Sequence, residues 1–227
     1  MRNAMQRIFS TTAVLGLMAG AAGQAQAAFV LFTDRPSFQA AVGSLTTENF
    51  NSIITDTVFT NSTLSFPGLT LRSTGGATAD ILVDVPPYEF NPGSANIDGT
   101  ARVNLGGLRP GSSVVSILFN APVSAVGFDT VNYDIDNDTA QAFVGSTLIG
   151  SFPPASNLTG FIGVLDTSGA TISSVDIRTS AAGNAFNAFD NVSFATGGAA
   201  VPEPSSLVLV AIAGLAGIGA ARRRRGA

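Results

Sequence analysis

Short runs of apolar residues alternate with polar clusters through the middle of the chain, and Gly, Pro, Asn, Asp and Ser separate these runs. Runs rich in β-branched and aromatic residues are typical of strands bounded by turns. Within 123–130, for example, Val126 and Phe128 share one face, which is the period of a half-buried strand. The pattern predicts strands at 64–66, 69–72, 81–85, 114–119, 123–130, 141–144, 148–152, 160–165, 174–178 and 189–194. We therefore predict a mainly β domain, folded as a jelly-roll-like antiparallel β-sandwich.

One segment, 33–43, has a helical pattern instead. Either Thr33 or Asp34 can cap its start, Pro36 suits the first turn, and Gly43 ends it. The sequence therefore predicts one short helix that leads into the sandwich.

The N-terminus has the layout of a secretory signal. Arg2 and Arg7 precede a mostly apolar stretch over 8–22, and Ala25 and Ala27 place small residues where signal peptidase reads. We expect residues 1–27 to be removed after Ala27. The alternative is an N-terminal helix that stays in the fold.

The C-terminus has three parts: a Pro-Glu-Pro box at 202–204, an apolar run over 207–221 and four arginines at 222–225. Fifteen helical residues reach about 22 Å, which is short of the roughly 30 Å hydrocarbon core. Positive charges fix the end in the cytoplasm, so the segment is a weak anchor helix. The alternative is a permanent single-span membrane protein. The anchor residues are Leu207, Val208, Leu209, Val210, Ile212, Leu215, Ile218, Arg222, Arg223, Arg224 and Arg225.

This tail resembles the PEP-CTERM sorting signal of Gram-negative bacteria, through Pro202, Glu203 and Pro204, the apolar run and the basic end. The resemblance implies processing by an exosortase after transient holding in the inner membrane. The final location is then the cell surface or the extracellular matrix.

The sequence is accordingly divided into a signal peptide (1–27), a β-sandwich domain (28–195), a flexible linker (196–200) and the sorting segment (201–227). The helix, then Glu48-Asn49-Phe50, then Phe189-Asp190-Asn191-Val192 near the end of the domain are similar to exported β-domains that carry this tail. The usual acidic pair around the first Phe is replaced here by Asn49 and Asn51.

The amino-acid composition limits which partners, catalytic groups and metal ions the domain can use. Residues 28–200 carry a net charge of −9, which repels phosphate backbones and argues against nucleic acid. The chain has no His and no Cys, so imidazole bases, thiolate nucleophiles and conventional zinc sites are excluded. We predict no catalytic residues and no enzyme activity, and calcium is the cation that oxygen ligands could still hold.

Two candidate calcium sites follow. Glu48 and Asp190 lie in phase with Phe50 and Val192, so both carboxylates are expected to face the core and to need a partner. The alternative is that they face solvent or accept turn amides.

The second candidate calcium site is a loop over 134–138, with carboxylates at Asp134, Asp136 and Asp138, although a plain hydrophilic turn fits as well.

The sequence favours an exported surface or matrix protein with a structural or adhesive role. The alternative is a calcium-dependent carbohydrate-binding module of the exopolysaccharide matrix, with Tyr88, Phe90 and Tyr133 as aromatic candidates. A third hypothesis is a hydrolase that uses two carboxylates.

Overall fold

The computed structural model describes residues 29–77, 79–88, 97–111, 113–133, 138–168, 171–179 and 185–196. The predicted signal peptide, the PEP box, the anchor run, Phe90, Asp134 and Asp136 lie outside these residues. Among the residues that are described, no helix is long and apolar enough to cross a membrane.

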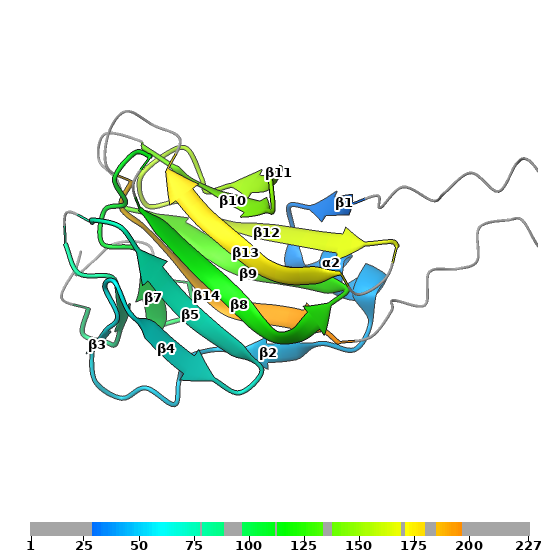
Figure 1. Ribbon diagram of the computed structural model, residues 1–227, viewed down its shortest axis with the longest axis horizontal. Helices are drawn as coiled ribbons and strands as arrows, with labels where there is room; N and C mark the ends of the chain where they lie inside the picture. The colour runs from blue at the N-terminus through cyan, green and yellow to red at the C-terminus, as the bar shows by residue number, and fades with distance from the viewer. Residues whose placement is uncertain are drawn as a thin grey trace, which may run out of the picture.

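Two antiparallel sheets pack face to face, as Figure 1 shows. The large sheet has eight strands in the order β1-β12-β9-β14-β7-β6-β3, with β2 also paired to β14, and the small sheet has the order β11-β10-β13-β8-β5-β4. The elements are β1 (Phe29–Phe32), α2 (Arg35–Val42), β2 (Thr46–Glu48), β3 (Thr57–Val58), β4 (Thr63–Phe66), β5 (Leu69–Thr74), β6 (Leu82–Asp84), β7 (Arg102–Asn104), β8 (Val114–Val123), β9 (Ala125–Asn132), β10 (Ala140–Val144), β11 (Thr147–Ser151), β12 (Thr159–Asp166), β13 (Ile172–Thr179) and β14 (Asn187–Ala195). The predicted mainly β sandwich with one short helix is confirmed, and each predicted strand overlaps an observed one.

Alternate residues of the large sheet fill the space between the sheets. Val126, Phe128, Phe189 and Phe194 all belong to the main apolar core, together with inward residues of the small sheet such as Ile117. Because neighbouring residues of a strand point to opposite faces, the remaining positions of β9 and β14 lie on the outer face of the large sheet.

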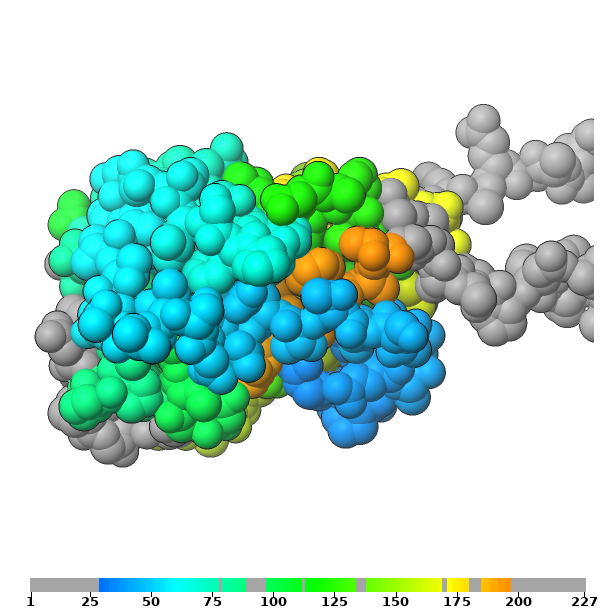
Figure 2. All heavy atoms as spheres, turned by 90° about the horizontal axis from the view of Figure 1, so that it is seen from below, coloured from blue at the N-terminus to red at the C-terminus, as the bar shows by residue number. Residues whose placement is uncertain are grey.

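Helix α2 covers part of that outer face. Asp34 caps the helix by accepting a 2.8 Å hydrogen bond from the Ser37 amide. Its buried residue, Phe38, packs where β9 has Gly127, and a Cβ at this glycine would come within 2.5 Å of the Phe161 ring. Figure 2 shows the blue N-terminal region packed beside the orange β14. The helix is thus seated directly on the sheet.

A β-bulge in β14 corrects one sequence prediction. The register with β9 shifts between Asp190 and Ser193, and Asn191 adopts a positive φ of 53°. The extra residue changes the phase of the strand, so Val192 faces the core whereas Asp190 lies opposite Asp129 on the outer face. Asp190 is nevertheless fully buried.

Both ends of the described domain lie at the same end of the sandwich (Figure 1). Phe29 pairs with Asp166, whose amide donates to the Ser124 carbonyl at 2.7 Å, and the Ser124 amide donates to the Ala195 carbonyl at 2.9 Å. The first residue of β12, Thr159, therefore lies towards the opposite end.

Candidate functional site

The outer face of the large sheet carries two polar clusters. The first, which we call the Arg35 cluster, consists of Arg35, Asp98, Asp129, Asp190, Asn191 and Ser193. The second, the Arg102 cluster, consists of Asp84, Tyr88, Arg102, Asn104 and Tyr133. A small hollow opens beside the first cluster.

Arg35 is the first residue of α2, and its guanidinium connects the helix to two strands. Its Nε and Nη2 lie 3.1 and 3.0 Å from the two carboxylate oxygens of Asp129. Its Nη1 donates to the Ser193 Oγ and its Nη2 to the Asn191 carbonyl, both at 2.8 Å. This two-pronged geometry fixes the orientation of Asp129.

Asp190 lies directly opposite Asp129, on the neighbouring strand of the sheet. Its Oδ1 accepts a 2.6 Å hydrogen bond from the Asn191 amide, whereas its Oδ2 has no hydrogen-bond donor among the described residues. Burial raises the pKa of Asp190 to about 8 against the effect of the Asn191 amide, and the nearby Asp98 and Asp129 raise it further. Burial therefore favours the neutral form of Asp190 over its carboxylate.

Asp98 completes the cluster from the segment that lies over the sheet. The Asn191 Nδ2 donates to Asp98 and to Asp129, at 3.1 Å in each case. Burial acts to raise the pKa of Asp98, but hydrogen bonds from Thr100, Asn191 and Asp190 hold it below its usual value. The pKa values of Asp98 and Asp190 are thus displaced in opposite directions.

The hollow has a volume of about 280 Å³ and both polar and apolar walls. It is lined by Thr33, Ile97, Asp129, Thr159, Gly160 and Phe161. Asp129 offers a fixed acceptor and the threonines offer hydroxyls, while Phe161, with the Arg35 guanidinium 5.0 Å from its ring centre, supplies an apolar wall. Such a mixture suits a small ligand that carries hydroxyl groups on an apolar ring.

The Arg102 cluster is closed. Arg102 is 1% exposed, and its guanidinium carbon lies 3.7 Å from the Tyr88 ring centre and 4.5 Å from that of Tyr133. Arg102 also pairs with Asp84 at 3.4 Å. Burial raises the pKa of Asp84, and Arg102 opposes this shift. This cluster is a cation–π and ion-pair core rather than an open site.

Of the aromatic candidates for sugar stacking, Tyr133 is buried at 4% exposure and Tyr88 covers Arg102. Burial raises the pKa of the Tyr133 hydroxyl above its ordinary value. These two rings therefore have a packing role in the described structure.

The predicted calcium ligands are placed as follows. Glu48 is half-buried on β2 opposite Val192, and its Oε1 accepts a 2.8 Å hydrogen bond from the Phe50 amide, which is the turn-amide alternative. The backbone carbonyl of Asp138 accepts from the Asn132 Nδ2 at 3.4 Å. Within the described ranges, no group of three or more carboxylates is arranged to hold a metal ion.

Sequence reasoning missed Arg35, Asp98 and Asp129 as members of a site. One signal for Arg35 was present, because a cation in the first turn of a helix is unfavourable for the helix dipole and indicates another partner. No comparable signal marks Asp98, since its partners are distant in sequence.

Among known protein families, a sorting motif in the C-terminal tail matches this chain. Residues 200–225 match the PEP-CTERM protein-sorting motif. No curated protein matches the chain at a significant level. The chain thus carries the sorting motif of exosortase substrates and is an exported protein.

Several solved structures resemble the domain distantly. A mutant of a family 29 carbohydrate binding module has 17% identity and a TM-score of 0.35, over 66% of this chain and 99% of that one. The cleaved adhesin domain of Lys-gingipain from Porphyromonas gingivalis has 12% identity and a TM-score of 0.42, over 68% and 100%. A family 35 carbohydrate binding module from Clostridium thermocellum has 14% identity and a TM-score of 0.33, over 62% and 97%. TM-scores this low carry no inference about the function of the present domain.

Proposed function

We propose that the domain is a non-catalytic adhesive protein of the cell surface or extracellular matrix of a Gram-negative bacterium. Signal peptidase removes 1–27, the tail holds the protein transiently in the inner membrane, and an exosortase acts near Pro202-Glu203-Pro204. Adhesion is to exopolysaccharide, which binds in the hollow beside Asp129.

The observation that carries this proposal is the chemistry of the hollow. Asp129 is held by Arg35 and Asn191 before any ligand arrives, so little ordering is needed on binding. Thr159 and Gly160 begin β12 at the end of the sandwich opposite Phe29 and Ala195. A ligand can therefore reach the hollow while the sorting tail is still attached.

The net charge of the domain determines which class of polysaccharide it can bind. A domain with a net charge of −9 repels polymers rich in uronic acids. The fixed Asp129 acceptor is instead suited to hydroxyl or ammonium groups. Neutral and amino-sugar polymers are the expected ligands.

The same site argues against the two-carboxylate hydrolase. Asp190 is the acid whose pKa is raised, but it is fully buried and does not line the hollow. A general acid must reach the leaving oxygen of the substrate. The exposed Asp98 shares the Asn191 amide with Asp129, but its pKa is held below its usual value, so it is a poor proton donor near pH 7.

Affinity electrophoresis in gels that contain dextran, chitosan or alginate tests the proposal. The wild type should be retarded by dextran or chitosan and not by alginate. Thr159→Trp, which fills the hollow, should lose most of the retardation. Thr63→Trp is the matched control, because Thr63 is also the exposed first residue of a strand. Equal retardation of both variants would refute this binding site.

A further inference from the structure

The two sheets leave an apolar groove along one side of the sandwich, between the edge strands β1 and β11. The groove has a volume of about 260 Å³. Val30 and Leu31 on β1 are 42% and 51% exposed, and Leu148 on β11 is 43% exposed. The groove is lined by Leu31, Phe32, Thr33, Leu148, Ile149, Gly150, Ser151, Phe161 and Ile162.

The absence of charge in the lining limits which kinds of partner can bind in the groove. None of the lining residues is charged, although the domain as a whole carries −9. A basic peptide finds no carboxylate in the groove, and an acidic peptide finds no cation there. An uncharged, apolar strand edge is the complementary occupant.

The strand β1 provides such an edge. Its sequence, Phe29-Val30-Leu31-Phe32, has no charge and no proline, which are the usual devices that keep an edge strand from pairing. At the opposite edges of the two sheets, β3 has only two residues and β4 exposes Thr63 and Ser65. The β1 edge is therefore the side of the sandwich best suited to extension.

We propose that two copies of this chain pair through β1, antiparallel to each other, so that the large sheet continues across both copies. Residues that lie directly opposite each other in an antiparallel pair point to the same face of the sheet, and faces alternate along a strand. In a symmetric pair, one residue of β1 must therefore lie opposite its own copy, and the central residues Val30 and Leu31 are the two candidates. The contact places the uncharged, apolar edge strands of the two copies against each other. The partner is thus a second copy, and the interface is isologous.

Cysteine cross-linking tests the pairing, because the chain has no cysteine of its own. The full chain is exported from a bacterial host, and the secreted protein is purified as Val30→Cys, Leu31→Cys or Leu158→Cys. Directly opposed Cβ atoms lie about 4.5–5.5 Å apart in an antiparallel pair, so mild oxidation should cross-link the first or second variant. Leu158 is 48% exposed but is not part of the groove, so the third variant should stay largely uncross-linked.

Light scattering coupled to gel filtration gives the second readout. The wild type should have twice the mass of one chain, Leu31→Lys should have the monomer mass, and Leu158→Lys should remain a dimer. A monomeric wild type, or a dimer that survives Leu31→Lys, would overturn the proposal. Neither result depends on polysaccharide binding, so this inference can fail independently of the proposed adhesion.

Discussion

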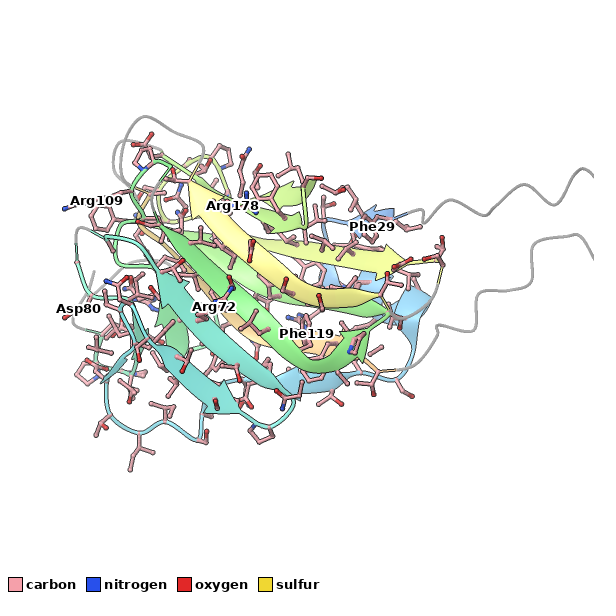
Figure 3. All side chains as sticks on the ribbon, in the orientation of Figure 1. Phe29, Arg72, Asp80, Arg109, Phe119 and Arg178 are labelled. Carbon is pink, nitrogen blue, oxygen red and sulfur yellow. The ribbon has the colours of Figure 1, made fainter. Side chains whose placement is uncertain are left out.

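The outer faces of the two sheets contain the same kinds of side chain in different surroundings. On the large sheet, Arg35 and Asp129 pair at 3.0 Å and are 22% and 21% exposed. On the small sheet, Arg178 and Asp176 also pair at 3.0 Å but are 41% and 28% exposed. Figure 3 labels Arg178 on the open face of β13.

The difference lies in what covers each face. Helix α2 and the segment around Asp98 lie over the large sheet, so its polar groups are desolvated and linked to one another. The comparison indicates that cover, rather than residue type, decides how far an ion pair on a sheet is removed from solvent.

The largest expected effect is at the most buried pair on the covered face. Arg102→Ala leaves Asp84 buried without its cation and should lower the free energy of unfolding by about 3–5 kcal/mol. Arg178→Ala on the open face should cost about 1 kcal/mol or less. Urea denaturation measures both, and equal losses would contradict the comparison.

The second effect is a pH dependence. The pKa of Asp190 is about 8 when folded and near 3.8 when unfolded, so the folded state binds more protons between these values. Stability from this group is full below pH 4 and declines as the pH rises towards 8.

Asp190→Asn should remove that decline. The variant should match the wild type near pH 4 and exceed its stability at pH 8 by on the order of 5 kcal/mol. Denaturation curves at the two pH values measure the difference, and Asp176→Asn on the open face is the control. A variant that is less stable than wild type at pH 8 would show that the buried carboxylate is needed in its charged form.

Much of the fold follows from the sequence, and the exceptions have physical reasons. Periodicity located the strand around Ile177 because buried and more exposed residues alternate there. It also located the strand around Phe128 from the spacing of Val126 and Phe128, although nearly all of that strand is buried. It missed β1, which directly follows the predicted signal peptide, and β2, β3 and β7, which have only two or three residues each.

The candidate site was harder to predict. The prediction assumed strict alternation of faces along the strand, and it therefore placed Asp190 in the core. The bulge at Asn191 breaks this alternation, and asparagine is one of the residues that tolerate the positive φ found there. Arg35 and Asp98 come from distant segments, and only in the folded chain does Arg35 contact Asp129 and Asp98 share the Asn191 amide with it.

A smaller effect concerns calcium. Because Glu48 already accepts the Phe50 amide, we expect no calcium-dependent rise in the unfolding temperature from a Glu48 and Asp190 site. Thermal unfolding with calcium and with EDTA measures this. A rise that Asp136→Ala abolishes would assign calcium to the 134–138 loop instead, and a rise that Glu48→Gln abolishes would contradict our expectation.

The most direct test of the central claim compares Asp129→Asn with Asp176→Asn. Each variant removes the negative charge from one Arg–Asp pair, and unfolding curves establish that both remain folded. The account predicts that Asp129→Asn weakens polysaccharide binding at least about tenfold, a loss of roughly 1.4 kcal/mol, while Asp176→Asn binds like the wild type. Unchanged binding by a folded Asp129→Asn variant would contradict the claim that the covered face of the large sheet holds the ligand.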